Sequence, residues 1–206
     1  ALTDESALPE VPPSVPSGLP VVEQVANPAR EVVKLANVAL TESGVLAHEA
    51  TVVRVGPNET IQQAVDRSGP GDTIEVPYGI YHEAVVLDWS DVKLIGIPNE
   101  KGEWPVIDGE GTRSDGVIAS GNNFEMAFFA VKNYTSNGVL VEGSTGVQLH
   151  DLYIENTGVY GVYPVRCTDV LMERIEGTLM NDAAIYAGKS ANVVIRDTLT
   201  YGNVIG

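Results

Sequence analysis

The second half of the chain repeats one pattern of small, apolar and polar positions at a fixed interval. The pattern is clearest in three stretches that begin at Ser136, Val159 and Asp182, which gives a 23-residue repeat. Within each stretch the apolar positions come in short pairs with one residue between them, which is the period of a β-strand. Clusters of Gly, Asn, Ser and Thr separate these strands. The pattern therefore predicts one coil of strands and turns per repeat.

Aligning the chain at this interval places apolar residues in four columns. They are Phe124, Val147, Val170 and Val193; Met126, Leu149, Met172 and Ile195; Phe129, Leu152 and Ile175, ending in Thr198; and Val139, Val162 and Ile185. A repeat of this length is too short for a strand, a crossover helix and a second strand, which argues against an ordinary α/β sheet. The fold class that we predict is an all-β, right-handed parallel β-helix with about 4.8 Å between coils.

Upstream of the repeat, the spacing between equivalent strands is longer. Val92 and Phe124 occupy equivalent positions across a 32-residue interval, and we assign the excess to an inserted loop over residues 98–116. Before it, a strand that begins near Thr51 leads into a short amphipathic helix, which Asn58 can cap. We expect this helix to cover the open end of the stack, where unpaired backbone and apolar core would otherwise face water.

The first 50 residues have a different composition from the rest. Five prolines occur among residues 1–20, which is typical of an extended, partly polyproline linker, and residues 27–40 could form a short helix. We therefore divide the chain into a tail of residues 1–50 and a β-helix of residues 51–206. Because Gly206 falls partway through a coil, we expect either a truncated solenoid or an end that a partner covers.

Charge and cysteine content narrow the possible partners. The formal net charge of −16 argues against nucleic acid and against an anionic membrane surface, because both require clustered Lys and Arg. The sequence has no apolar run of the length that a transmembrane helix needs. Its single cysteine, Cys167, excludes an intramolecular disulfide.

Three stretches carry a resemblance to a known family. TIQQAVDRSGPGDTIEVPYGIYHEAVVL, GVYPVRCTDVLMERI and AAIYAGKSANVVIRDTLTYGN together resemble the pectin-lyase-like superfamily of parallel β-helices, and in particular the bacterial exported "parallel β-helix repeat" proteins of unassigned activity. The resemblance covers residues 51–206. It implies export to the periplasm, the cell surface or the medium, and a carbohydrate ligand. The superfamily includes polysaccharide lyases, hydrolases and epimerases, but this chain lacks their active-site motifs.

Stacked coils bring ionisable side chains together in two adjacent columns. The columns are His150, Glu173 and Arg196, and beside them Asp151, Arg174 and Asp197. As a catalytic site, they offer a base, a cation to neutralise a uronate, and two carboxylates, Asp151 and Asp197, at a separation that suits an inverting hydrolase. The alternating signs also fit a structural ion-pair ladder that specifies the register of the coils.

Two further groups are candidate ligand sites. Tyr163 and Tyr186 share an outward column and could stack on a sugar ring, or they could simply pack together; Trp89 and Trp104 could also stack on a sugar, although no spacing argument places them. In the inserted loop, Asp108, Glu110 and Asp115 could hold Ca²⁺ through carboxylate oxygens, or form a solvated acidic loop.

These observations leave two functional hypotheses. The first is a binding or scaffold protein, whose ligand is a carbohydrate or a larger surface assembly contacted through the tail and the uncapped end. The alternative is a polysaccharide-processing enzyme, either a uronate lyase, an epimerase or a glycoside hydrolase, that acts through the charged columns.

Overall fold

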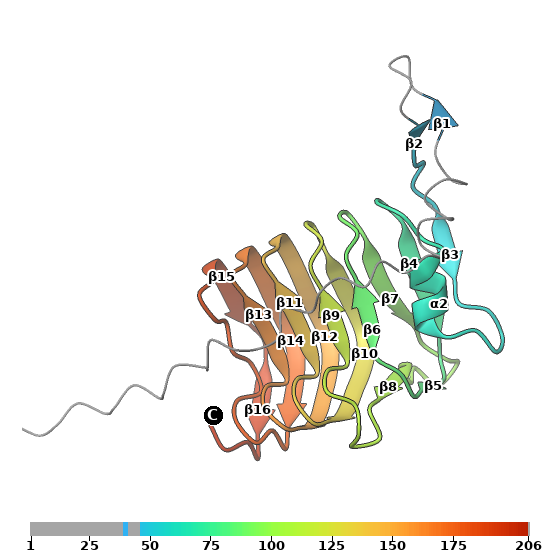
Figure 1. Ribbon diagram of the computed structural model, residues 1–206. Helices are drawn as coiled ribbons and strands as arrows, with labels where there is room; N and C mark the ends of the chain where they lie inside the picture. The colour runs from blue at the N-terminus through green and yellow to red at the C-terminus, as the bar shows by residue number, and fades with distance from the viewer. Residues whose placement is uncertain (1–38, 41–45, 206) are drawn as a thin grey trace, which may run out of the picture.

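The computed structural model describes residues 39–40 and 46–205 of the chain (Figure 1). The predicted linker over residues 1–38 and 41–45 lies outside the described residues, and so does most of the helix predicted for 27–40. Within the described part, β1 (Ala39–Leu40) and β2 (Leu46–Ala47) form a small antiparallel sheet of their own.

Within the described residues, the solenoid consists of one short helix and fourteen strands. In chain order the elements are β3 (Val52–Arg54), α2 (Ile61–Asp66), β4 (Thr73–Pro77), β5 (Ile80–Tyr81), β6 (Val85–Leu87), β7 (Lys93–Ile97), β8 (Val106–Asp108), β9 (Val117–Ala119), β10 (Glu125–Tyr134), β11 (Val139–Glu142), β12 (Thr145–Thr157), β13 (Val162–Val165), β14 (Thr168–Thr178), β15 (Ala191–Arg196) and β16 (Leu199–Tyr201).

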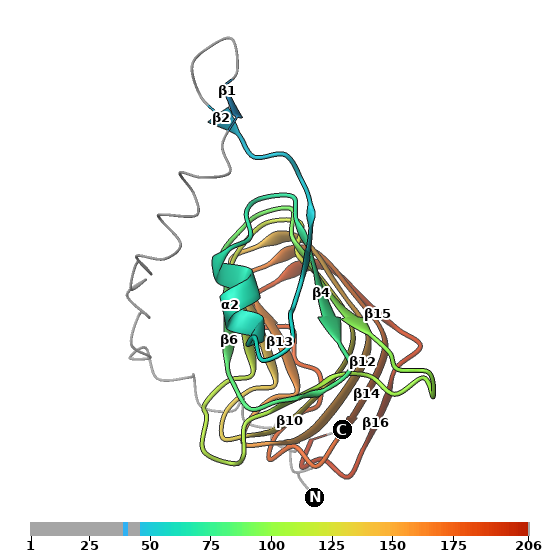
Figure 2. The ribbon, with the colours of Figure 1, turned by 90° about the vertical axis from the view of Figure 1, so that its right-hand side faces the viewer.

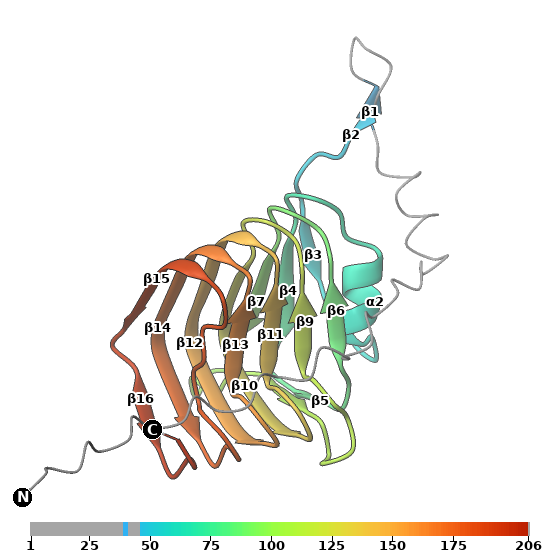
Figure 3. The same ribbon diagram turned by 60° about the vertical axis from the view of Figure 1, so that its left-hand side comes forward.

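These strands wind into a parallel β-helix with three faces (Figures 1 and 3). The first face carries β3, β4, β7, the first parts of β10, β12 and β14, and then β15, in the order of the coils. The second face carries β5, β8, the second parts of the three long strands, and β16. The third face carries β6, β9, β11 and β13. Every strand pair in the solenoid is parallel, and the predicted right-handed parallel solenoid is confirmed.

The register of the strands follows the interval read from the sequence. Met126 pairs with Leu149, Leu149 with Met172, and Met172 with Ile195, so each step equals one predicted repeat. Val139 likewise pairs with Val162, which bridges to Ile185. The inward side chains of these columns form one apolar core along the axis of the solenoid.

The predicted insertion over residues 98–116 is not a single loop. Strand β8 lies inside it and pairs with β5 on one side and β10 on the other. Lys93 still pairs with Glu125 across the 32-residue interval, so the register is kept. The excess residues lie mainly in the loop between β7 and β8, residues 98–105. This loop lies next to the candidate functional site.

Helix α2 begins slightly later than the sequence suggested. Its N-cap is Thr60, whose hydroxyl accepts a hydrogen bond from the Gln63 amide at 3.1 Å, while the Gln63 side chain accepts one from the Thr60 amide. Asn58, the expected cap, has a φ of 66° and lies in the loop before the helix. This conformation differs from the extended backbone of an N-cap residue. Ile61, Ala64 and Val65 are buried in the common core, at the end of the solenoid next to β6 (Figure 2).

Candidate functional site

A repeated backbone bend separates the first face from the second. It occurs at Phe128, Asp151, Arg174 and Asp197, whose φ values of 64°, 53°, 50° and 54° place all four in the left-handed region. Asp tolerates this conformation well, whereas it is uncommon for bulky residues such as Phe and Arg. Because the bend recurs once in each of these coils, one such residue from each coil lies at the same corner. The corner thus gathers side chains that are far apart in the sequence.

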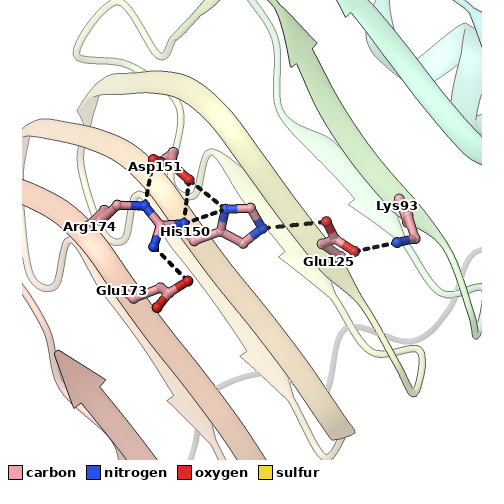
Figure 4. Close-up of polar contacts among 6 residues, drawn as sticks. All are labelled: Lys93, Glu125, His150, Asp151, Glu173 and Arg174. Carbon is pink, nitrogen blue, oxygen red and sulfur yellow. Dashed lines mark hydrogen bonds and ion pairs between the residues drawn. The ribbon is translucent and has the colours of Figure 1, made fainter. Parts of the chain in front are cut away.

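Alternating charges at this corner form a continuous chain of contacts (Figure 4). Lys93 Nζ lies 2.7 Å from Glu125 Oε2, and the other oxygen of Glu125 lies 3.4 Å from His150 Nε2. On the opposite side of the imidazole, Nδ1 lies 2.6 Å from Asp151 Oδ2. His150 is therefore held between two carboxylates.

The chain of contacts continues into the next two coils. Arg174 donates from Nε and Nη2 to the two oxygens of Asp151, at 2.9 and 2.8 Å, and its Nη1 lies 2.7 Å from Glu173 Oε1. Arg196 donates from Nε to Glu173 Oε2 at 2.7 Å. We call the seven residues Lys93, Glu125, His150, Asp151, Glu173, Arg174 and Arg196 the charged corner.

The contacts of the charged corner keep its carboxylates ionised. Hydrogen bonds from Arg174 lower the pKa of Asp151 and of Glu173, and in both cases they outweigh the effect of desolvation. Burial raises the pKa of Glu125, but the hydrogen bond and charge of Lys93, together with His150, outweigh it and lower the pKa. The Arg174 pKa is raised in turn by its two carboxylate partners. None of these carboxylates is prepared to serve as a protonated acid at neutral pH.

Two aromatic rings extend the charged corner toward the N-terminal coils. The ring of Phe128 meets the imidazole of His150 edge to face, with centroids 5.9 Å apart, and meets the ring of Trp104 in a similar way at 6.1 Å. Trp104 belongs to the loop 98–105, where Asn99 accepts hydrogen bonds from the amides of Lys101 and Glu103. The loop is thus internally ordered and presents its indole beside the corner.

The structure brings together five of the six residues predicted from the two charged columns. His150, Glu173 and Arg196 are paired in register on adjacent strands, and Asp151 binds Arg174. Asp197 is exposed and does not join the chain of contacts.

Three residues of the site, Lys93, Glu125 and Phe128, were not predicted, and Trp104 was a candidate sugar platform that was not connected with the charged columns. Applying the longer interval that joins Val92 to Phe124 would have placed Lys93 beside Glu125, and Phe128 lies one repeat before Asp151. No periodic signal locates Trp104, because it lies in the insertion.

The predicted tyrosine pair lies on the third face, near the C-terminal coils. The rings of Tyr163 and Tyr186 are 5.5 Å apart, and Tyr160 joins them, with ring centroids 4.6 Å from Tyr186 and 4.8 Å from Tyr163. Burial raises the pKa of both Tyr160 and Tyr163. The three rings pack on one another, and Tyr186 is still 44% exposed.

The acidic side chains of the insertion do not converge on one point. Asp108 accepts hydrogen bonds from the Glu110 amide and the Asn133 side chain, Glu110 pairs with Arg113, and Asp115 accepts from Asn137. Across residues 39–40 and 46–205, no three His, Cys, Asp or Glu side chains are placed to hold a metal ion. The geometry therefore gives no support to a Ca²⁺ site at Asp108, Glu110 and Asp115, because each carboxylate is engaged by a different protein partner.

Comparison with known proteins identifies the fold. No family model and no curated protein sequence matches this chain. Among solved structures, an alginate lyase from Paenibacillus sp. str. FPU-7 is similar with a TM-score of 0.57 and 12% identity, covering 75% of this chain and 68% of that one. A pectin methylesterase from Aspergillus niger matches with a TM-score of 0.39 and 20% identity, covering 72% of this chain and 60% of that one. The first similarity supports the parallel β-helix fold that the sequence indicated.

No helix among the described residues is long and apolar enough to cross a bilayer.

Proposed function

We propose that this protein binds a polysaccharide on the outer surface of its first face, at the charged corner and the adjoining rings of Trp104 and Phe128. The observation that carries the proposal is the contact of these two rings with His150, inside an array of charged hydrogen-bonding groups. Sugars present apolar ring faces and a rim of hydroxyl groups, so they are bound by aromatic side chains flanked by fixed polar groups.

The shape of the first face suits a linear polymer. One column that points away from the core runs through every coil of that face, from Arg54 through Ile95 and His150 to Arg196; within it Ala127 and Glu173 are covered by their neighbours, and the other positions are at least partly exposed. Successive positions are about 4.8 Å apart, so the column extends for almost 30 Å. A chain molecule lying along it can contact equivalent positions of several coils, and each contact adds to its affinity.

The contacts of the charged corner favour binding over catalysis. Both ring nitrogens of His150 face protein carboxylates, so neither is presented to a substrate as a free base. The lowered pKa values of Glu125, Asp151 and Glu173 leave no carboxyl group protonated to act as a general acid. A paired and hydrogen-bonded surface of this kind is preorganised to recognise a ligand.

A polysaccharide-processing enzyme is the second candidate. The Asp151 carboxylate lies 2.6 Å from Nδ1 of His150 and orients the imidazole, as in acid–base dyads, while the 3.4 Å contact of Nε2 with Glu125 is long enough to be displaced by a substrate. Turnover of pectate, alginate or neutral glycans that disappears in His150→Ala would establish this alternative.

Export and the division of the chain at residue 50 are further parts of the proposal. They are supported by the resemblance of residues 51–206 to exported β-helix proteins. The role of α2 in covering one end of the core is supported by the burial of Ile61, Ala64 and Val65.

The binding proposal is tested by affinity electrophoresis and calorimetry on a panel of acidic and neutral polysaccharides. We expect Trp104→Ala to weaken binding about tenfold, since stacking of one aromatic side chain contributes about 1.4 kcal/mol. Tyr201→Ala is the matched control, because it removes an exposed ring from the second face. Equal binding by the wild type and Trp104→Ala, or an equal loss in both variants, would contradict the proposal.

A further inference from the structure

A separate cleft lies at the N-terminal coils of the solenoid. It has a volume of about 680 Å³ and is formed by two loops, residues 54–60 between β3 and α2, and residues 77–83 around β5. Ligand pockets in proteins commonly have volumes of this order. Arg54 lies in the same outward column as His150, four coils away, which places it about 19 Å from His150 at the spacing of the coils.

The two carboxylates that line this cleft already have structural roles. Glu59 accepts two hydrogen bonds from Arg67, at 2.8 and 3.0 Å, and a third from the Gly56 amide at 2.7 Å. Glu83 accepts from the amides of Ile61 and Gln62, at 2.8 and 2.9 Å. Their negative charges are therefore satisfied within the fold.

The basic side chains of the cleft are, in contrast, weakly engaged. Arg54 is 63% exposed and lies 3.9 Å from Glu75, which is long for an ion pair. His82 is 50% exposed and lies 3.6 Å from Glu110. In a chain with a net charge of −16, the cleft thus offers a guanidinium and an imidazole that an incoming anion can bind.

Apolar and aromatic side chains form a further part of the cleft wall. Tyr78 and Ile80 are 46% and 60% exposed. The Tyr81 ring is fixed by a hydrogen bond from its hydroxyl to the Pro77 carbonyl at 2.8 Å. The ring also packs closely over Gly79, since a Cβ atom added at Gly79 would lie 3.3 Å from it. The cleft therefore has a rigid aromatic wall next to Arg54 and His82.

We propose that this cleft is a second binding site, for a small organic carboxylate that carries a ring. Arg54 binds the carboxylate through two parallel N–H groups and exchanges its long contact with Glu75 for a shorter one. Tyr78, Ile80 and Tyr81 cover the apolar face of the ring. The site is distinct from the charged corner, and its ligand is a small molecule or a chain end.

The test uses two matched probes, para-nitrophenyl β-D-glucuronide and para-nitrophenyl β-D-glucoside, which share their rings and differ in the carboxylate. Binding is measured by titration of the full chain while the backbone amide signals of Gly56 and Gly79 are followed by NMR. We expect the glucuronide to shift both signals and the glucoside to bind about tenfold more weakly. Arg54→Gln should weaken glucuronide binding about tenfold, because it removes the charge-assisted hydrogen bonds.

Two further variants separate this site from the proposed polysaccharide site. Tyr78→Ala should weaken both probes, whereas Trp104→Ala should leave the glucuronide affinity unchanged. Arg54, Tyr78 and Trp104 are at least partly exposed, so these variants are expected to fold. Equal affinities for the two probes, unchanged binding by Arg54→Gln, or absence of shifts at Gly56 and Gly79 would overturn the proposal.

Discussion

The buried carboxylate of Asp72 is the polar centre of the first coil. Its Oδ1 lies 2.7 Å from His48 Nε2 and accepts from the Thr51 amide at 2.7 Å and the Thr51 hydroxyl at 3.0 Å. Its Oδ2 accepts from the Gly69 amide at 2.8 Å, and the whole residue is inaccessible to solvent. Asp72 thereby ties the segment before β3 to the turn that follows α2.

Replacing Asp72 by Asn keeps the volume of the side chain but removes one acceptor. If the amide oxygen keeps the three contacts of Oδ1, the new NH₂ group faces the Gly69 amide, and two donors oppose each other. A hydrogen bond to a charged group contributes roughly 1.5–3 kcal/mol, and a buried donor without an acceptor costs about 1–3 kcal/mol. We therefore expect Asp72→Asn to lower the free energy of unfolding by about 3 kcal/mol.

Thermal and urea denaturation measure this loss directly. For a domain of this size, 1 kcal/mol changes Tm by about 2–4 °C, so the expected decrease is about 6–12 °C. Asp169→Asn is the matched control: Asp169 is exposed, accepts one hydrogen bond from Asn192 at 2.9 Å, and should change stability by less than about 0.5 kcal/mol.

The solenoid can also lose its first coil locally, because each coil contacts only its neighbours. Amide hydrogen exchange at Val53 and Val55 would report such local opening even if the main transition moved less than expected. A Tm within about 2 °C of the control, together with unchanged exchange in these residues, would refute the assignment of Asp72 as an anchor of the first coil.

Two further predictions concern the core and the charged corner. Leu149→Ala should lower the free energy of unfolding by about 2–5 kcal/mol in urea titrations, because Leu149 is fully buried between neighbouring coils. Val194→Ala, at an exposed position, should have a much smaller effect. Comparable losses in the two variants would contradict the assignment of Leu149 to the core. Because Arg174 lowers the pKa of Asp151 in the folded state, the stability that Asp151 contributes is present above the ordinary Asp pKa of about 3.9 and is lost as the pH falls through the lower, folded value. The stability difference between the wild type and Asp151→Asn should therefore be constant near neutral pH and shrink in acid, and a difference that does not vary with pH would refute this explanation.

The sequence predicted the stacking of the coils better than the contacts within the site. Met126, Leu149 and Met172 could be aligned because hydrogen bonding between parallel strands requires a whole number of residues per coil. The helix cap was misplaced, since Asn58 and Thr60 are both good caps, and only the backbone conformation decides between them.

The contacts of His150 show why a column does not determine a site. Its in-register neighbour on β10 is Ala127, yet its Nε2 reaches Glu125, two residues away along that strand. Diagonal contacts of this kind depend on the direction of long side chains, which the repeat interval does not specify. Arg174 binds Asp151, its neighbour in the predicted column, but it also binds Glu173, the preceding residue on its own strand, which the column alone does not indicate.

The sequence by itself determined that the chain forms a parallel β-helix and which residues are neighbours from coil to coil. It could do so because the same periodic pattern determines which side chains enter the apolar core and which residues pair in the hydrogen-bonded register of neighbouring strands. Only the tertiary structure decided that Trp104 lies beside Phe128 and His150, and that loops 54–60 and 77–83 enclose a cleft. Those placements depend on non-repeating loops, whose conformations are set by local turns such as the one at Asn99 and by the surface on which they pack.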